Sequence, residues 1–327
     1  MRKILGMGNA LTDILFRIES DDVLMQLNLP RGSMQLVDGA KSAEISAFLS
    51  DVDKTMAAGG SASNTINGIS KLGGDAAFVG KIGHDDIGTF FKQDMVNNGV
   101  TPALLSSDTP SGRCIVLVSP DGERTMCTYL GASAEIVAGD LKREMFDGYD
   151  IFHIEGYLVQ NHDLIREAVK LAKESGLMVS IDLASYNVVE ANLSFLQEII
   201  EKYVDIVFAN EEESKAFTGS DPENALIHIS GKCSIAVVKI GKEGSLIKSG
   251  DDIHHVKPFL TECIDTTGAG DLYAAGFLFG LANDYPLDIC GKIGSLVSAN
   301  VVAVVGAKMT DAVWRRIQTE IIRFVTV

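Results

Sequence analysis

Apolar runs about the length of a β-strand recur along the chain and alternate with segments whose apolar residues follow helical spacing. The strand-like runs are Lys3–Met7, Ala76–Ile82, Ile151–Ile154, Leu177–Leu183, Asp205–Phe208 and Ser234–Ile240. The helix-like segments are Ser63–Leu72, His162–Ser175, Asn192–Lys202, Glu211–Phe217, Asp271–Asn283, Leu287–Val305 and Asp311–Phe324. Most strand-like runs are apolar throughout, which is typical of a sheet covered on both faces. The alternation predicts an α/β fold with a mainly parallel sheet.

Two segments in the first half of the chain depart from this alternation. Leu11–Asp38 places a polar turn between two short strand-like pieces, and Arg113–Ser119 and Thr125–Leu130 flank the turn sequence PDGE, which favours a hairpin. We interpret them as a small β-rich lid, formed from about residues 12–38 and 104–131, within a single domain spanning residues 1–327. A pair of ordinary surface hairpins is the alternative.

Composition limits the possible partners. Hydrophobic residues make up 46% and charged residues 22% of the chain, which indicates a large core and excludes a disordered protein. The formal net charge of -16 argues against nucleic acid or an anionic membrane as a partner. The electric field of this net negative charge would also repel an anionic nucleotide. Any phosphate site must therefore be local and built mainly from backbone N–H groups.

The cysteines and the longest apolar stretches indicate a cytoplasmic protein with no membrane partner. The five cysteines form no C-x-x-C pair, so neither a zinc site nor a disulfide framework is expected, and free thiols fit a reducing compartment. The longest apolar stretches, Leu272–Leu281 and Ile293–Ala307, are shorter than the roughly 18 residues that a membrane span needs.

The segment Asp265–Asp271, which reads DTTGAGD, carries the strongest chemical signal. Gly268, Ala269 and Gly270 allow the backbone to approach a ligand closely, and their N–H groups open a predicted helix, where anions are favoured. Asp271 would repel an anion, but it suits a general base that takes the proton of an attacking hydroxyl while the N–H groups stabilise the transferred phosphoryl group. The alternative is a helix-capping Asp with glycines for tight packing.

Candidate substrate-binding residues follow two other predicted elements. Asn9 and Asp13 come just after the first strand, and Asp13 is able to accept hydrogen bonds from two sugar hydroxyls. Gly59 and Gly60 permit close approach ahead of a helix on which Asn64 offers both a donor and an acceptor. The alternatives are a solvated strand-end carboxylate for Asp13 and an ordinary first-turn helix residue for Asn64.

Candidate nucleotide-binding residues lie at the carboxyl ends of two further strands, where α/β sheets bind ligands. Asn210 and Glu213 open a helix, and Glu213 is suited to orient the water shell of Mg²⁺. A carboxylate at a helix N-terminus is also stabilised without any ligand, so that alternative stays open. Gly241 and Gly244 form a turn after the strand Ser234–Ile240.

Several better-known patterns are weak or absent. Gly6 and Gly8 begin a dinucleotide fingerprint, but Leu11 replaces its third glycine, so an NAD-dependent oxidoreductase rests on two glycines alone. The sequence contains no G-x-x-x-x-G-K-[ST] and no G-x-S-x-G, and its six histidines show no metal-ligand spacing.

The motifs, taken in their order, resemble the ribokinase/phosphofructokinase-B family of sugar and nucleoside kinases. They are Gly8-Asn9 with Asp13, Gly59-Gly60 with Asn64, Lys81–Gly88, Asn210-x-x-Glu213 and Asp265–Asp271. Within that family, Gly6–Ile14, Ala58–Ser61 and Tyr203–Glu211 are most similar to the adenosine kinase subgroup. The resemblance covers nearly the whole chain.

The resemblance implies a three-layer α/β/α sandwich with a lid, and a kinase that uses ATP, Mg²⁺ and K⁺. It implies that Asp271 is the base, that Gly268–Gly270 form the anion hole, and that Asn9, Asp13, Gly59, Gly60 and Asn64 hold the acceptor's hydroxyls. Asn210, Glu213, Lys239, Gly241 and Gly244 would serve Mg-ATP, Asp265, Thr267 and Gly306 a monovalent cation, and Arg124 the transferred phosphate.

Four residues depart from the pattern of the relatives. Lys239 stands where many members have Thr, Asp182 where adenosine kinases have Asn, and Met126 and Thr128 where their base pocket is apolar. The acceptor is therefore a nucleoside such as adenosine, or a free sugar such as ribose, fructose or a keto-sugar acid. A non-catalytic nucleotide or sugar sensor is a third hypothesis. We expect a monomer or a homodimer, and the helix-like segment Asp21–Leu29 favours the monomer.

Overall fold

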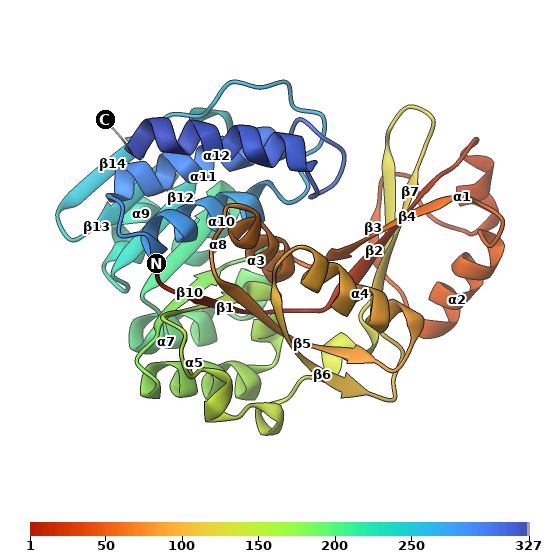
Figure 1. The fold of residues 1–327 in the computed structure, drawn as a ribbon, viewed down its shortest axis with the longest axis horizontal. Coiled ribbons are helices and arrows are strands. Elements are labelled where there is room, and N and C mark those ends of the chain that lie inside the picture. Colours follow the sequence, from red (N-terminus) through yellow and green to blue (C-terminus); the bar gives the residue numbers. More distant parts are fainter. Residues whose placement is uncertain (326–327) are drawn as a thin grey trace.

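Two β-sheets organise the chain in a computed structural model that describes residues 1–325 (Figure 1). The strands of the large sheet, in spatial order, are β14 (Asp252–Val256), β13 (Ser245–Ser249), β12 (Ile235–Lys239), β11 (Ile206–Asn210), β10 (Met178–Asp182), β9 (Ile151–Glu155), β1 (Ile4–Met7), β5 (Ala76–Gly83) and β6 (Thr101–Ser107). From β12 to β6 every neighbouring pair is parallel, whereas β13 and β14 are added in antiparallel orientation.

Helices cover both faces of the large sheet, so the main body has three layers (Figure 1). One face carries α3 (Ser61–Lys71), α4 (Asp86–Asn97), α10 (Ala269–Ala282), α11 (Leu287–Val301) and α12 (Asp311–Val325). The other carries α5 (His162–Glu174), α6 (Tyr186–Ala191), α7 (Leu193–Tyr203), α8 (Glu211–Thr218) and α9 (Pro222–Ser230).

The central strands are apolar throughout because each of their faces meets a layer of helices. In β1, for example, Ile4 packs into the core beneath α3 and α10, whereas Leu5 and Met7 pack into the core beneath α5. Side chains alternate between the faces of a strand, so both halves of the strand's residues must be apolar. The predicted α/β fold with a mainly parallel sheet is confirmed.

The small sheet stands beside the main body, to the right in Figure 1. Its strands, in spatial order, are β3 (Met34–Leu36), β8 (Arg124–Tyr129), β7 (Gly112–Val118), β2 (Leu11–Arg17) and β4 (Lys54–Gly59). One face packs on α1 (Asp22–Gln26) and α2 (Gly39–Phe48) through an apolar cluster that includes Ile14, Ile115 and Ile45. The opposite face is directed to the cavity described below.

The observed boundaries correct several expectations. Lys54–Gly59 forms a strand of the small sheet that was not predicted. Thr101–Ser107 lies in the large sheet, so the predicted lid segment 104–131 begins outside the small sheet. The helix expected over Leu287–Val305 ends at Val301, and the chain continues through turns to Gly306, whose φ is +78°. Among the described residues, no helix is both long and apolar enough to cross a lipid bilayer.

Candidate active site

A cavity of about 1280 Å³ lies where the carboxyl ends of the large sheet's strands face the small sheet. Asp182, Asn210 and Lys239, the last residues of β10, β11 and β12, line it from the main body. Leu11 and Asp13 of β2 line it from the small sheet, and the start of α10 lies between the two. The cavity therefore gathers most of the residues singled out in the sequence, from segments more than 250 positions apart. Four candidate site residues do not line it: Gly59, Arg124, Asp265 and Gly306.

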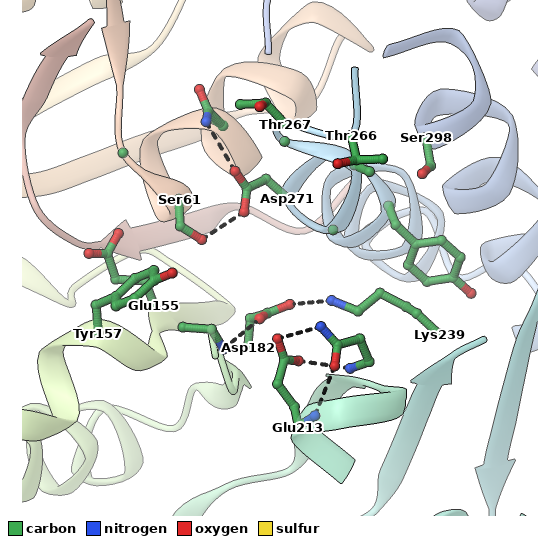
Figure 2. A pocket seen from close by; sticks show the side chains of 18 of the residues that line it. Ser61, Glu155, Tyr157, Asp182, Glu213, Lys239, Thr266, Thr267, Asp271 and Ser298 are labelled. Atoms are coloured by element: carbon green, nitrogen blue, oxygen red, sulfur yellow. Dashed lines mark hydrogen bonds and ion pairs between the residues drawn. The ribbon is translucent and has the colours of Figure 1, made fainter. Parts of the chain in front are cut away.

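Asp271 lies in the first turn of α10 and is held by two residues of α3 (Figure 2). Ser61 Oγ donates to its Oδ1 at 2.7 Å and Asn64 Nδ2 donates to its Oδ2 at 3.0 Å. Burial raises the pKa of Asp271 above its ordinary value, although both hydrogen bonds act in the opposite direction. A carboxylate that is fixed in direction and raised in pKa has the properties of a general base.

The backbone that precedes Asp271 turns sharply into α10. Gly268 has a φ of +74° and is packed so closely that an added Cβ would lie 2.6 Å from the Cβ of Ala307. Glycine is favoured here for both reasons. Gly268, Ala269 and Gly270 all line the cavity at the start of a 14-residue helix. Ala269 N donates to the carbonyl oxygen of Thr266 at 3.1 Å, so the N–H groups of Gly268 and Gly270 are the ones offered to a ligand.

Asp13 and Gly60 line one wall of the cavity, and Gly59 packs against the Asp13 carboxylate. An added Cβ on Gly59 would lie 2.3 Å from Asp13 Oδ2, and one on Gly60 would lie 2.3 Å from the carbonyl oxygen of Asn9. Burial raises the pKa of Asp13 to about 6, against the opposing charges of Lys308 and Arg124. Asn9 and Asn64 also line the cavity, and Asn64 Oδ1 has no hydrogen-bond partner among the described residues.

Glu155, the last residue of β9, is a site residue that sequence reasoning missed. It is 1% exposed, and its carboxylate accepts from the backbone N–H groups of Asn9 at 2.9 Å and Ala62 at 3.0 Å, and from Asn9 Nδ2 at 2.5 Å. Burial raises its pKa to about 7. Glu155 thereby ties together the end of β1, the start of α3 and β9. A carboxylate that directly ends a strand whose other residues, apart from His153, are apolar was the signal available in the sequence.

Asn210 and Glu213 satisfy one another at the start of α8. Glu213 N donates to Asn210 Oδ1 at 2.8 Å, and Asn210 N and Nδ2 donate to the Glu213 carboxylate, each at 2.7 Å. Burial, followed by the negative charge of Asp182, raises the pKa of Glu213 to about 7. This reciprocal capping is the structural alternative considered from the sequence, yet both side chains also line the cavity.

Lys239 and Asp182 form an ion pair in the middle of the cavity wall, with Nζ 2.8 Å from Oδ2 (Figure 2). Two of the departures from the family pattern are thus direct partners. Burial acts to lower the pKa of Lys239, but the carboxylates of Asp182 and Glu213 outweigh it, so the pKa is raised. Gly241 and Gly244 follow Lys239 and line the same wall, both with positive φ.

Asp265 and Arg124 join the two halves of the site. Asp265 Oδ1 accepts from Thr267 N at 3.0 Å, and Oδ2 accepts from Gly306 N at 2.6 Å and pairs with Arg124 at 2.7 Å. Burial acts to raise the pKa of Asp265, but the hydrogen bonds from Gly306 and Thr267 outweigh it and the pKa is lowered. Arg124, on β8, also donates to the hydroxyl of Thr267. The structure thus brings together Asp265, Thr267 and Gly306, the three residues of the expected cation loop. Arg124 forms an ion pair with the carboxylate of Asp265.

Comparison with known proteins decides the family. A model of the pfkB family carbohydrate kinases matches residues 51–312. This chain belongs to the pfkB family. It is accordingly an ATP-dependent phosphotransferase that acts on a sugar or a nucleoside, and its use of ATP, usually with Mg²⁺, follows from the family.

Individual pfkB relatives include kinases of both acceptor classes. The chain is 33% identical to the adenosine kinase of Sinorhizobium meliloti, whose structure superposes with a TM-score of 0.84 over 98% of this chain and 99% of that one. It is 30% identical to an uncharacterized sugar kinase of Archaeoglobus fulgidus, over 74% of this chain and 96% of the relative. It is 28% identical to a probable fructokinase of Arabidopsis thaliana, over 84% and 88%.

The pfkB assignment removes two of the earlier hypotheses. The family is one of kinases, so the chain is not an NAD-dependent oxidoreductase, and β1 leads into strand β2 without the helix that a dinucleotide fingerprint requires. The hypothesis of a non-catalytic nucleotide or sugar sensor is also rejected, because the chain is an enzyme.

Proposed function

We propose that this kinase transfers the γ-phosphate of Mg-ATP to a primary hydroxyl of a nucleoside similar to adenosine. The observation that carries the reaction is the position of Asp271, which is fixed by Ser61 and Asn64 in the first turn of α10, where Gly268 and Gly270 also line the cavity. Asp271 takes the hydroxyl proton as the hydroxyl oxygen attacks phosphorus, and the N–H groups of Gly268 and Gly270 stabilise the charge on the transferred group.

The face of the small sheet next to Asp13 supports a nucleoside acceptor. Strand register places Asp13 beside Cys114, Cys114 beside Thr128 and Thr128 beside Leu36, so these four side chains share one face. Leu36 is 74% exposed and lines the cavity. An acceptor held through its hydroxyls by Asp13 would lay its remaining part against Cys114, Thr128 and Leu36. The Thr128 hydroxyl, which departs from the apolar pocket of adenosine kinases, donates to Cys114 Sγ at 3.4 Å, so this row suits a flat nucleobase better than further hydroxyls.

A free sugar is the second candidate, and the likeness to a probable fructokinase favours it. A coupled assay of ADP release across nucleosides, ribose, fructose and keto-sugar acids distinguishes the two. We expect turnover with at least one purine nucleoside at micromolar concentration. Turnover confined to free sugars would reverse the order of the two candidates.

We propose that Glu213, helped by Asn210, orients the water shell of Mg²⁺. Among the described residues, no group of three His, Cys, Asp or Glu side chains could hold a metal ion alone, so the ion would take its other ligands from water and the ATP phosphates. When bound, Mg²⁺ would neutralise phosphate charge during the transfer. Gly241 and Gly244 would lie along the nucleotide.

We also propose that K⁺ binds at the loop of Asp265, Thr267 and Gly306, and that Arg124 competes with it. Arg124 already neutralises Asp265, so K⁺ would gain this carboxylate only when Arg124 turns to the transferred phosphate. Rates measured in K⁺ and in Li⁺, for the unaltered chain and for Arg124→Met, test this idea. An equal rate in both salts for both proteins would contradict it.

We propose that the small sheet acts as a lid over the acceptor, because it carries both Asp13 and Arg124 and faces the main body across the cavity. All five cysteines are free thiols, which supports a cytoplasmic location. Whether the kinase is a monomer or a homodimer is open to sedimentation measurements.

A further inference from the structure

The ion pair of Lys239 and Asp182 bridges two strands of the large sheet that are not neighbours, at the wall of the cavity. Lys239 ends β12, Asp182 ends β10, and β11 lies between them. Neighbouring strands are about 4.8 Å apart, so the two backbones are separated by roughly 10 Å and only a long side chain closes the gap. Their side chains are 15% and 8% exposed, and both line the cavity.

Stabilisation of the fold does not account for this pair. Taking two charges out of water costs about as much free energy as their attraction returns, so a buried ion pair is weak evidence for a stabilising role. The pair also lies on a cavity wall instead of within either apolar core. A role towards a ligand explains its position better.

The Lys239 ammonium lies beside the proposed anion hole. An added Cβ on Gly270 would lie 3.0 Å from Lys239 Nζ, so the ammonium adjoins the first turn of α10 (Figure 2). The negative charges of Asp182, Glu213 and Asp271 all act on this lysine. In a chain of net charge -16, these carboxylates would repel ATP unless a cation beside them met the phosphates.

We propose that Lys239 is a catalytic residue that exchanges partners during turnover, and that Asp182 is the positioning residue that holds it. Before nucleotide binds, Asp182 keeps the Lys239 ammonium beside α10. When ATP binds, the ammonium donates a hydrogen bond to a phosphate oxygen instead. This inference rests on the proposed use of ATP at this site.

The exchange adds no chemical step to the transfer. Asp271 takes the proton of the acceptor hydroxyl, the acceptor oxygen bonds to the γ-phosphorus, and the bond from phosphorus to the ADP oxygen breaks with its electron pair left on ADP. Lys239 keeps its proton throughout and lowers the free energy of the charged oxygens.

The local backbone supports the positioning role of Asp182. Ala184 N donates to Asp182 Oδ1 at 2.9 Å, which leaves Oδ2 to Lys239. Ala184 has a φ of +64°, a conformation that non-glycine residues seldom adopt, so this turn is held in a costly geometry next to the carboxylate.

A double-mutant cycle tests the proposal, with Lys239→Met, Asp182→Asn and the double variant. The readouts are the Kd of Mg-ADP and of a non-hydrolysable Mg-ATP analogue by calorimetry, and kcat. We expect Lys239→Met to weaken the ATP analogue about 30-fold, since a charge-assisted bond to phosphate is lost and three carboxylates stay uncompensated. Acceptor binding should change by less than about twofold.

Asp182→Asn should have the opposite effect on binding. Removal of its negative charge should tighten the ATP analogue by about threefold, while kcat falls about tenfold because Lys239 is no longer held in place. The double variant should bind the analogue more tightly than Lys239→Met alone. Lys239→Arg, which keeps the charge, should bind it within about fivefold of the unaltered chain, which separates charge loss from misfolding.

Lys248→Met is the matched control, because Lys248 lies on the neighbouring strand β13 and its Nζ donates to the carbonyl of Gly250, away from the cavity. The proposal is wrong if Lys239→Met binds the ATP analogue as Lys248→Met does, or if Asp182→Asn weakens it as much as Lys239→Met. Failure of the proposed function looks different, since the unaltered chain itself would then bind no ATP analogue.

Discussion

The two ends of the cavity are built in different ways. The phosphate end is charged, and its central part, Asp265–Asp271, is one continuous stretch that opens α10. The acceptor end is a sheet face in which Leu36, Thr128, Cys114 and Asp13 come together only through strand register. The first end depends on local backbone geometry and the second on tertiary pairing. Under the proposed function, the chemistry is readable from a short motif, whereas acceptor choice depends on the whole small sheet.

The largest expected effect comes from a substitution at the phosphate end alone. Asp271→Asn removes the proposed base but keeps a side chain that Ser61 and Asn64 can still contact. We expect kcat to fall by about 10³-fold to 10⁴-fold, towards the upper end of what general-base catalysis contributes. Binding of the ATP analogue, measured by calorimetry, should change by less than about threefold. Turnover within tenfold of the unaltered chain would show that another group takes the proton.

A change at the acceptor end should have a different kinetic signature. Asp13→Asn replaces an acceptor of two hydrogen bonds by an amide, and we expect KM for the acceptor to rise about 100-fold, as for the loss of hydrogen bonds to a charged group. The KM for ATP should stay within about twofold. Steady-state kinetics with each substrate varied in turn measure both values, and an equal rise in the two would argue against separate ends.

How far the sequence predicts this molecule follows from the same difference. The central strands and DTTGAGD were predictable because continuous apolar runs and a glycine-rich helix start are local patterns. The strand Lys54–Gly59 was missed because half of it is polar or exposed and it is stabilised by pairing with β2. Glu155 was missed because its role depends on N–H groups of Asn9 and Ala62, which no spacing in the sequence places beside it. The pairing of Lys239 with Asp182 likewise required the strand order.

The pH profile should sharpen the comparison, because both ends carry carboxylates with raised pKa values. Burial raises the pKa of Glu213 to about 7 and that of Asp13 to about 6, and it raises the pKa of Asp271. In the proposed roles each group acts as the ionised carboxylate, so protonation at lower pH should remove activity. We expect kcat/KM for the acceptor to fall by about tenfold per pH unit between about 7 and 6, where Glu213 becomes protonated, and by about 100-fold per unit well below 6, where Asp13 is protonated as well.

Measurements of kcat/KM from pH 5.5 to 9 with Asp13→Asn assign this profile. That variant should lose the part of the decline centred near pH 6 and keep the part contributed by the phosphate end. A profile that is flat down to pH 5.5 in the unaltered chain would show that ionisation of these carboxylates does not control the reaction of the acceptor with the nucleotide-bound enzyme, to which kcat/KM refers.

The smallest expected effect concerns the row of Cys114, Thr128 and Leu36 that distinguishes a nucleoside from a free sugar. Leu36→Ser removes an exposed apolar side chain from the cavity wall without touching the hydroxyl-binding residues. We expect KM for the nucleoside to rise about fivefold, for the loss of roughly 1 kcal/mol of apolar contact, while kcat changes little. A free sugar, too small to reach from Asp13 to Leu36, should show no change.

Met25→Ser is the control for this last change, because Met25 is 68% exposed on α1 but does not line the cavity. Met25→Ser should leave KM for the nucleoside and KM for the free sugar unchanged, which would exclude a general effect of polar substitution on the small sheet and its helices. If Leu36→Ser matches Met25→Ser for every nucleoside, the base does not contact this row. Acceptor specificity would then have to come from the main-body side of the cavity, near Tyr157 and Glu155 (Figure 2).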